Sequence, residues 1–413
     1  MKLLWILPYT PTSIRTRPYN LLQALIRAGH HLTLATVCEK PEERETLEKL
    51  SAQGVRVISE HLARPQMAIN LGVAFWGGKP LQSRYSWSPR LAGRLINLLR
   101  NEQFDAVHVE HLRGSVYGLL AAKVLAGARQ AERVVWDSVD CISLLFEQAA
   151  RRSRSGFGRW VTRLELPRTR RYEQALVGSF PTTLVTSAND KAAFERLAGR
   201  SLPQVRVLPN GVDSAYFSPG DEPKAAAEVV FSGKLSYHAN VTAALHLVQQ
   251  VMPHVWAARP ETRVVLAGKD PANEMVRLGQ ADPRVVVTGT VADLRPYLRR
   301  ATVAAALVPY GAGIQNKVLE AMACGTAVVG SPQSAAALDV LPGREMLVVD
   351  GAEAQAQALL HVLENDILMA QLSAAGRAYV AAQHDWGRIA AQLEEIYQVG
   401  DGRNRTEHHV STE

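Results

Sequence analysis

The sequence predicts an α/β protein made of two consecutive units, each a doubly wound parallel sheet. Apolar strand-like runs alternate with amphipathic helical stretches along nearly the whole chain, and this βαβ pattern requires parallel strands that are covered on both faces. The chain has 413 residues, of which 47% are hydrophobic. That length exceeds what one hydrophobic core usually holds, so we expect at least two domains.

The strands fall into two series. Gly29 separates the first helix, at 17–28, from the strand that follows it, and further helices are expected at 87–102 and 114–125. The first series of strands comprises 3–7, 32–37, 55–58, 106–109, 133–136 and 183–186. The second comprises 206–208, 228–231, 263–267, 284–288, 303–308, 327–329 and 346–349.

These series predict a first domain over 1–204, a second over 205–385 and a last helix at about 386–399. Residues 400–413 are polar and without periodicity, so we expect a disordered tail. Ligands of doubly wound sheets bind at the carboxyl ends of the strands, and two such units facing one another would form a cleft.

Composition and cysteine usage indicate a cytoplasmic protein. The apolar run Leu3 to Leu7 is interrupted by Pro8 and is expected to be a buried strand instead of a signal peptide. No apolar stretch reaches the roughly 18 residues that a membrane helix needs. Cys38, Cys141 and Cys324 are isolated, which favours reduced thiols over disulfides.

The net charge of +7 is concentrated in one window, because eight arginines lie between Arg151 and Arg171. Trp160, Val161 and other apolar residues interleave with them, which suits an amphipathic segment on anionic lipid head groups and a peripheral place at the inner face of the membrane. A solvated helix face with ion pairs explains the pattern equally well. No nucleic-acid fold signature accompanies the charge, so nucleic acid is not an expected partner.

The strongest functional pattern lies between Tyr310 and Val329. The strand at 303–308 leads through a glycine-rich loop into a short helix that Gly325 ends. Glycines let backbone N–H groups approach a phosphate, and a helix N-terminus adds partial positive charge at the same place. Glu320 can accept hydrogen bonds from ribose hydroxyls, and Lys317 lies one turn before it. The combination predicts a cradle for a nucleotide sugar.

Three motifs carry a resemblance to a known family: Gly-Ala-Gly-Ile-Gln-Asn-Lys-Val-Leu-Glu at 311–320, Pro-Asn-Gly-Val-Asp at 209–213 and Phe-Ser-Gly-Lys at 231–234. Together they resemble the donor half of family-4 glycosyltransferases, retaining enzymes of the GT-B fold, and in particular the branch associated with bacterial exopolysaccharide clusters. The resemblance implies two Rossmann-like domains facing across a cleft, with the last helix bracing the first domain. It also implies a donor-binding set in the second domain: Gly233, Lys234, Gly289, Val291, Gly311, Gly313, Ile314, Gln315, Lys317 and Glu320.

The leaving diphosphate of such a donor must be neutralised by a metal ion or by fixed cations and backbone dipoles. Asp137 and Asp140 have the wrong spacing for an Asp-x-Asp metal motif, so we expect no metal and no cofactor besides the donor itself. The chain departs from the resembled pattern at Ala312, where a glutamate is usual, and at Ala239, where a second basic residue is usual; the donor sugar is thereby left open. Residues of the first loop could contact a phosphate or an anionic acceptor: Ser13, Arg15 and Arg17.

The strand at 106–110 offers candidates for catalysis. Its period of two places His108 and Glu110 on one face, with His111 at the carboxyl end. The resembled enzymes place a histidine near this strand end, close to the anomeric carbon of the donor. Strand register favours Glu110 for that place and residue type favours His111; with Lys234 they form the candidate catalytic set. His108 is expected to be a packed, hydrogen-bonded histidine.

The expected function is metal-independent transfer of a sugar, with retention, from a nucleoside diphosphate to a saccharide, lipid-linked or natural-product acceptor, in exopolysaccharide or glycoconjugate synthesis. Front-face attack is expected, with the leaving phosphate accepting the proton of the acceptor. Two other classes stay open. A sugar-nucleotide 2-epimerase would convert the donor alone, and a non-catalytic nucleotide-binding scaffold would neither hydrolyse nor transfer the sugar.

Overall fold

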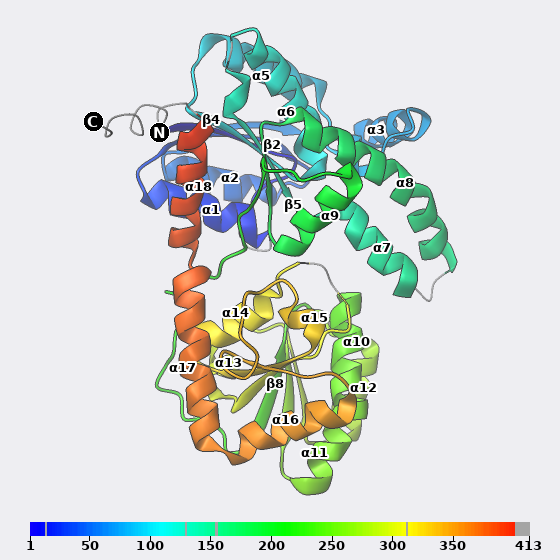
Figure 1. Ribbon diagram of the computed structural model, residues 1–413, viewed down its shortest axis with the longest axis vertical. Coiled ribbons are helices and arrows are strands. Elements are labelled where there is room, and N and C mark those ends of the chain that lie inside the picture. The colour runs from blue at the N-terminus through cyan, green and yellow to red at the C-terminus, as the bar shows by residue number, and fades with distance from the viewer. Residues whose placement is uncertain (13–14, 129, 153–155, 311–312, 401–413) are drawn as a thin grey trace, which may run out of the picture. The chain divides into compact units, whose positions relative to one another are not determined.

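The computed structural model describes residues 1–12, 15–128, 130–152, 156–310 and 313–400, with side chains at 149–161 and 400 left out of the description. The chain divides into two compact units. The first consists of Met1–Pro209 with Ile389–Glu413, and the second of Asn210–Arg388 (Figure 1). Each unit has its own sheet and its own core.

The sheet of the first unit is entirely parallel, in the order β3-β2-β1-β4-β5-β6-β7. The order reverses between β1 and β4, which makes their carboxyl ends the expected ligand position of a doubly wound sheet. The strands are β1 (Lys2–Leu7), β2 (His31–Cys38), β3 (Arg56–His61), β4 (Ala106–Glu110), β5 (Val134–Val139), β6 (Thr182–Val185) and β7 (Val205–Val207).

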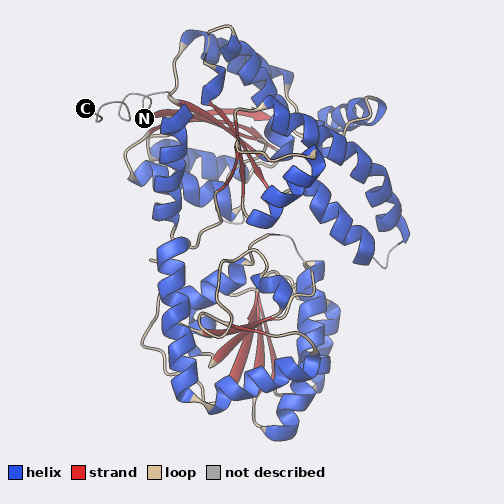
Figure 2. Ribbon diagram, viewed as in Figure 1, coloured by secondary structure: helices blue, strands red, loops and turns tan. Residues whose placement is uncertain are grey.

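Helices cover both faces of this sheet (Figure 2). The helices of this unit are α1 (Thr16–Arg27), α2 (Glu43–Ala52), α3 (Arg64–Trp76), α4 (Gln82–Tyr85), α5 (Pro89–Asn101), α6 (His111–Ala126), α7 (Ile142–Arg152), α8 (Gly156–Ser179), α9 (Ala188–Ala198) and the last helix α18 (Trp386–Gly400).

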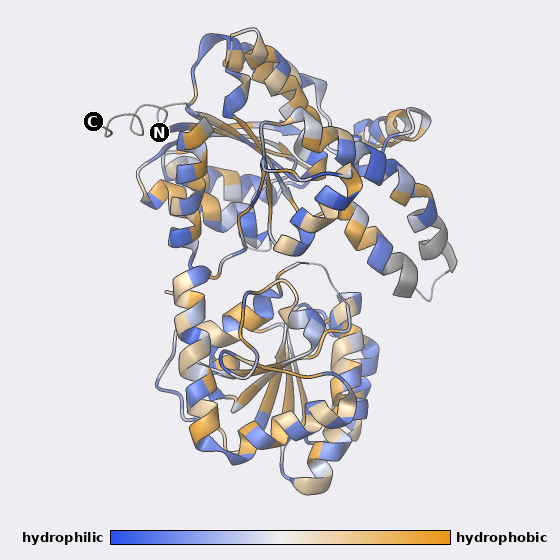
Figure 3. Cartoon of the chain, viewed as in Figure 1, coloured by the Kyte–Doolittle hydropathy of each residue, from blue (hydrophilic) through white to orange (hydrophobic). Residues whose placement is uncertain are grey.

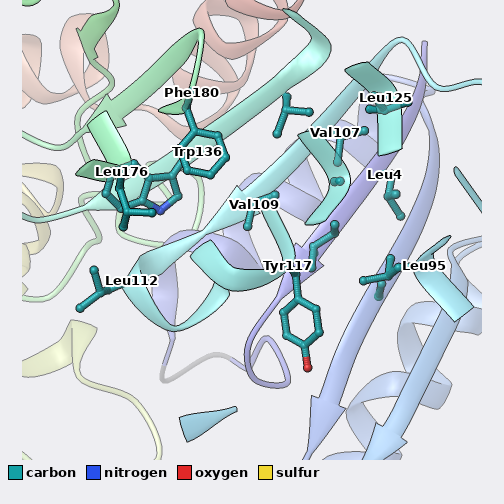
Figure 4. Packing of buried hydrophobic residues seen from close by; sticks show 14 of the residues in the cluster. Leu4, Leu95, Val107, Val109, Leu112, Tyr117, Leu125, Trp136, Leu176 and Phe180 are labelled. Atoms are coloured by element: carbon teal, nitrogen blue, oxygen red, sulfur yellow. The ribbon is translucent and has the colours of Figure 1, made fainter. Parts of the chain in front are cut away.

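Alternation along β4 decides what its side chains contact. Val107 and Val109 point into the core, where Trp136 and Phe180 pack with ring centroids 5.6 Å apart (Figure 4). His108 and Glu110 are buried outside that cluster. The core therefore fixes which β4 residues remain for polar contacts at the carboxyl end.

The sheet of the second unit is also parallel, in the order β10-β9-β8-β11-β12-β13, with its reversal between β8 and β11. Apolar residues run along its strands (Figure 3). The strands are β8 (Glu228–Ser232), β9 (Arg263–Ala267), β10 (Val285–Gly289), β11 (Val303–Ala306), β12 (Ala327–Gly330) and β13 (Leu347–Val348). The helices are α10 (His238–His246), α11 (Met252–Ala258), α12 (Asn273–Ala281), α13 (Arg295–Arg300), α14 (Asn316–Ala323), α15 (Pro332–Ala335), α16 (Ala352–Glu364) and α17 (Asp366–Gln383).

The predicted fold class, two doubly wound Rossmann-like α/β units, is confirmed by these sheets. One strand was assigned wrongly. The run at 206–208 is expected in the second series, but β7 pairs with β6 at the edge of the first sheet, with Thr183 opposite Val205. An edge strand of three residues carries no sequence signal that tells which sheet it joins. As a result, the boundary between the two units falls after Pro209 instead of after residue 204.

The last helix, expected at 386–399, is α18, and its residues from Ile389 onward belong to the first unit. Within that unit the Tyr397 hydroxyl lies 2.9 Å from His108 Nδ1. Residues 401–413, expected to be a disordered tail, lie outside the described residues. In the described part of the chain, no helix combines the length and apolar character that crossing a bilayer requires.

Candidate functional site

The N-terminus of α14 forms one side of the candidate site in the second unit. The chain leaves β11, passes Gly313, buried Ile314 and half-buried Gln315, and enters the helix at Asn316. The first backbone N–H groups of a helix have no partner within it and carry partial positive charge, so they favour an anion. Gly311 and Ala312, which precede them, lie outside the described residues.

The loops after β8 and β9 form the opposite side, and each contains a glycine that decides its backbone conformation. Gly233 and Gly268 have φ values of 138° and 151°, which side chains rarely adopt. A Cβ on Gly268 would lie 1.8 Å from the carbonyl oxygen of Gly233, so the two loops pack backbone against backbone. This contact fixes the main chain that carries Lys234, whose side chain is exposed.

Lys317 links the two sides. Its Nζ donates to Asn240 Oδ1 at 2.7 Å, and Asn240 Nδ2 donates to the carbonyl oxygen of Lys234 at 2.8 Å. A Cβ on Gly233 would lie 3.0 Å from Asn240 Nδ2, closer than side chains normally pack, so the glycine leaves room for the amide that holds Lys317. Asn240 is a site residue that the sequence analysis did not predict. The one signal for it in the sequence is that it follows Ala239, where the chain departs from the family pattern.

The two ionisable residues of α14 have pKa values that are shifted towards neutral pH. Burial lowers the pKa of Lys317 to about 8, against the opposing effect of the Glu320 charge. Burial raises the pKa of Glu320 to about 7, against the attraction of Lys317. Within the described residues the Lys317 charge is the only group that acts on the Glu320 carboxylate, so its oxygens remain able to accept hydrogen bonds from ligand hydroxyls.

Gly289 and Val291, predicted to contact the nucleobase, follow β10. Gly289 is left-handed, with φ 67°, and ends the strand. The Val291 side chain lines a separate hollow of about 550 Å³ that reaches Glu228 and Arg263 near the amino ends of β8 and β9.

In the first unit, His111 stands where β4 passes into α6. Its φ of 66° is left-handed, a conformation that histidine adopts more readily than most residues. The Arg113 N–H donates to His111 Nδ1 at 3.2 Å, which places the ring proton on Nε2. Burial lowers the pKa of His111 to about 3, so the ring is a neutral hydrogen-bond donor at physiological pH.

Glu110, the other candidate for that place, is buried. The Tyr9 hydroxyl donates to its Oε1 at 2.6 Å, and burial raises the pKa of Glu110 to about 8. A carboxyl group that is protonated at neutral pH and tied to Tyr9 is poorly suited to stabilise positive charge. The geometry therefore favours His111 over Glu110.

The first loop contains the arginines predicted to bind a phosphate or an acceptor. Arg17 is buried and donates through Nε and Nη2 to Asp137 Oδ2 at 2.9 and 2.8 Å, and through Nη1 to the Pro209 carbonyl oxygen at 3.1 Å. The guanidinium is thus engaged in an ion pair with a residue 120 positions away, and its contact with a phosphate or an acceptor stays a prediction. Ser13 lies outside the described residues.

Arg15 remains half-buried at the end of the first loop. Its guanidinium lies 4.1 Å from the centroid of the Tyr9 ring, and its Nη1 donates to the Thr10 carbonyl oxygen at 2.9 Å. His108 is fully buried, stacked on Trp5 at 4.0 Å and bonded to Tyr397, as expected for a packed histidine. The structure thus groups Gly233, Lys234, Lys317 and Glu320 in one unit, and Arg15, Glu110 and His111 in the other.

Comparison with known proteins matches two family models to the chain. Residues 15–216 match the family described as "Glycosyltransferase Family 4", and residues 226–365 match "Glycosyl transferases group 1". A sucrose-phosphate synthase of Thermosynechococcus elongatus has the same fold, with a TM-score of 0.63 and 19% identity over 97% of this chain and 99% of that one.

Two similar relatives are mannosyltransferases by name. The phosphatidyl-myo-inositol mannosyltransferase of Mycobacterium tuberculosis is 29% identical over 47% of this chain and 54% of the relative, so the match spans about half of that protein. A GDP-mannose-dependent monoacylated alpha-(1-6)-phosphatidylinositol monomannoside mannosyltransferase of Corynebacterium glutamicum is 26% identical over 75% of this chain and 81% of the relative.

Proposed function

This chain belongs to the family 4 and group 1 glycosyltransferases of the GT-B fold, and from this premise we propose that it transfers a sugar from a nucleoside diphosphate to an acceptor hydroxyl. The reaction is proposed to retain the anomeric configuration and to need no metal ion or other cofactor. The donor is assigned to the second unit and the acceptor to the first.

The observation that carries the proposal is the position of Lys317. Its ammonium group is held by Asn240 beside the Gly233 turn. The leaving diphosphate gains negative charge as the glycosidic bond breaks, and a fixed cation stabilises that change without reorganisation. A basic residue is usual at position 239, where this chain has alanine. Lys317 supplies a positive charge in its place, and exposed Lys234 adds a second cation.

Glu320 is proposed to accept hydrogen bonds from the ribose hydroxyls, since within the described residues only the Lys317 charge acts on its carboxylate. Main-chain groups complete the donor contacts in the proposal: those of Gly313, Ile314 and Gln315 for the phosphates, and those of Gly289 and Val291 for the base.

His111 is proposed to bind the transferred sugar through its Nε2 proton. In front-face attack the bond between the anomeric carbon and the phosphate oxygen breaks while the acceptor oxygen bonds to the same face of that carbon. The departing phosphate oxygen takes the acceptor proton, so no base from the protein is required. A neutral histidine fits this role because a cation would oppose the positive charge that develops on the sugar ring.

The relatives named above suggest which substrates to try first. Their names specify mannosyl transfer to inositol lipids, with GDP-mannose as the donor of one of them. We therefore propose GDP-mannose as the first donor to test and a lipid-linked saccharide as the first acceptor. Other saccharides of exopolysaccharide or glycoconjugate synthesis, and natural products, are the next acceptors to test.

The test combines a thermal-shift screen of nucleoside diphosphates with product analysis. A ligand at a hundred times its Kd stabilises the protein by about 2.7 kcal/mol, so the preferred base is identified from the melting temperatures. The matching donor is then incubated with and without acceptor. Transfer with retention supports the proposal, an epimerised donor indicates a 2-epimerase, and an unchanged donor indicates a non-catalytic scaffold.

A further inference from the structure

Helix α3 carries an exposed apolar face in the first unit. Ile69, Val73 and Trp76 are 58%, 49% and 87% exposed, and Phe75 is 40% exposed. Spacings of four and three residues place Ile69, Val73 and Trp76 on one side of the helix. Asn70 and Ala74 of this helix are buried and Met67 packs partly buried against the core, whereas Ile69, Val73 and Trp76 are left at the surface.

Helix α3 lies beside helix α8 (Figure 1). The Arg168 guanidinium lies 4.8 Å from the centroid of the Phe75 ring. Glu165 accepts a hydrogen bond from the Leu81 N–H at 2.8 Å, which ties the chain after α3 to α8. The surface that α3 and α8 form together is called the α3–α8 surface below.

Among the described side chains of α3 and α8, the exposed charged ones are basic. Between residues 61 and 101 the chain has no Asp or Glu, while the same stretch has six Lys and Arg residues, at 64, 79, 84, 90, 94 and 100. Both acidic residues of α8 are buried, Glu165 under the chain at Leu81 and Glu173 against the Ile142 and Ser143 N–H groups. Arg163, Arg171 and Lys79 are exposed beside them.

The arginines first noted in the sequence contribute in part. Arg170 pairs with Glu147 at 2.7 Å, an ordinary surface ion pair. The side chains of Arg151, Arg152, Arg154 and Arg159 lie outside the described residues. In the described part of the chain, the α3–α8 surface therefore combines the apolar residues of α3 with the exposed Arg163, Arg171 and Lys79.

We propose that the α3–α8 surface docks on a bilayer that contains anionic lipids, with Ile69, Val73 and Trp76 entering the head-group region. Exposed cations attract such a bilayer, and apolar side chains with a terminal Trp anchor the protein in it; together they provide the two signals that stable peripheral binding needs. Symmetric pairing of two copies through this surface would bring like charges together, which disfavours a second copy as the occupant. The proposal is independent of the transfer reaction.

The experiment is flotation of the full chain with vesicles of phosphatidylcholine alone and of an equimolar mixture with phosphatidylglycerol. The apolar variant is Ile69→Ser, Val73→Ser and Trp76→Ser, and the matched control changes Leu341 and Ile367 of the second unit, 57% and 73% exposed, to Ser. We expect salt-sensitive binding of the wild type to the mixed vesicles, the same for the control, and binding roughly tenfold weaker for the apolar variant. A variant with Arg163, Arg171 and Lys79 changed to Ser should lose the preference for anionic vesicles.

Insertion is measured as quenching of tryptophan fluorescence by brominated phosphatidylcholine in the vesicles. The wild type should be quenched in part, and Trp76→Phe should lose that part of the quenching because it lacks the inserted indole. All variants must have the melting profile of the wild type. We expect this because the substituted side chains are exposed. Equal flotation of the wild type and the apolar variant would overturn the proposal. So would a concentration-dependent dimer, without lipid, that the apolar variant abolishes, because it would make a second copy the occupant.

Discussion

At the scale of single residues, Lys317 and Glu320 lie one turn apart on α14 and each is placed where its charged form is disfavoured. Burial moves the pKa of Lys317 down to about 8 and that of Glu320 up to about 7, so both groups titrate near neutral pH. Titratable groups shifted in this way by burial concentrate at functional sites. A bound nucleotide would compensate both groups, through phosphate for the ammonium and hydroxyls for the carboxylate.

The affinity for the nucleotide should therefore have a maximum between pH of about 7 and about 8. Below this window Glu320 is protonated and loses its strong acceptor character; above it Lys317 loses its charge. Titration calorimetry across pH checks the prediction. Glu320→Gln should remove the acidic limb, whereas Lys224→Met should change neither limb, although burial also lowers the pKa of Lys224 to about 8.

The same shift has a consequence for stability. Because the folded pKa of Glu320 is raised from 4.5 to about 7, its favourable contribution is present at low pH and is lost as pH rises through about 7. Glu320→Gln should accordingly not lower the melting temperature at pH 8 while it weakens nucleotide binding. A pH-independent affinity in the wild type would contradict this account of α14.

His111 and Glu110 make a second residue pair that a matched experiment separates. His111→Ala removes the neutral Nε2 donor and should lower the turnover of donor about a hundredfold. Glu110→Gln keeps a buried, uncharged side chain beside Tyr9 and should change turnover little. Initial rates at saturating donor measure both; the reverse order would assign the place to Glu110.

At the scale of elements, both candidate sites lie at the reversal of strand order, between β1 and β4 and between β8 and β11. Glycines in the loops after β8 and β9 allow the close approach that positions Lys234. Gly268→Ala would put a Cβ 1.8 Å from the Gly233 carbonyl oxygen and force the loops apart. We expect a loss of about 2–4 kcal/mol in stability and a smaller nucleotide-induced shift in melting temperature.

Gly93→Ala is the control for that substitution. It lies in α5, has open space around its Cβ position and has no unusual φ, so alanine should stabilise the helix by about 0.5–1 kcal/mol. The nucleotide-induced shift should stay as in the wild type. An equal nucleotide-induced shift for Gly268→Ala would mean that the two-glycine contact does not position the site.

Periodicity and strand-end residues predicted most of the elements and the places of Gly233, Lys317 and His111, because these depend on local chain signals. The commitment of Arg17 to Asp137 and the link from Lys317 to Asn240 could not be predicted in this way. They join residues 120 and 77 positions apart, and such pairing is decided by how the strands order in the sheet. The membership of β7 in the first sheet was missed for the same reason.

At the scale of the whole molecule, the proposed reaction uses fixed cations of the protein in place of a metal ion. A chelator should therefore leave the rate of donor turnover unchanged, and added divalent ions should not raise it. Turnover is measured on protein freed of metal by dialysis. A rate that falls with the chelator and recovers with a single divalent ion would contradict metal-independent transfer.

The central claim is that Lys317 holds the diphosphate of a sugar nucleotide. The most direct test is the Kd of the preferred nucleoside diphosphate, at pH 7, for the wild type, Lys317→Met and Lys224→Met. Loss of one charged contact costs about 1.5–3 kcal/mol, so Lys317→Met should bind at least about tenfold more weakly, and Lys224→Met should bind like the wild type. The same Kd for all three proteins would contradict the assignment of the donor to this loop.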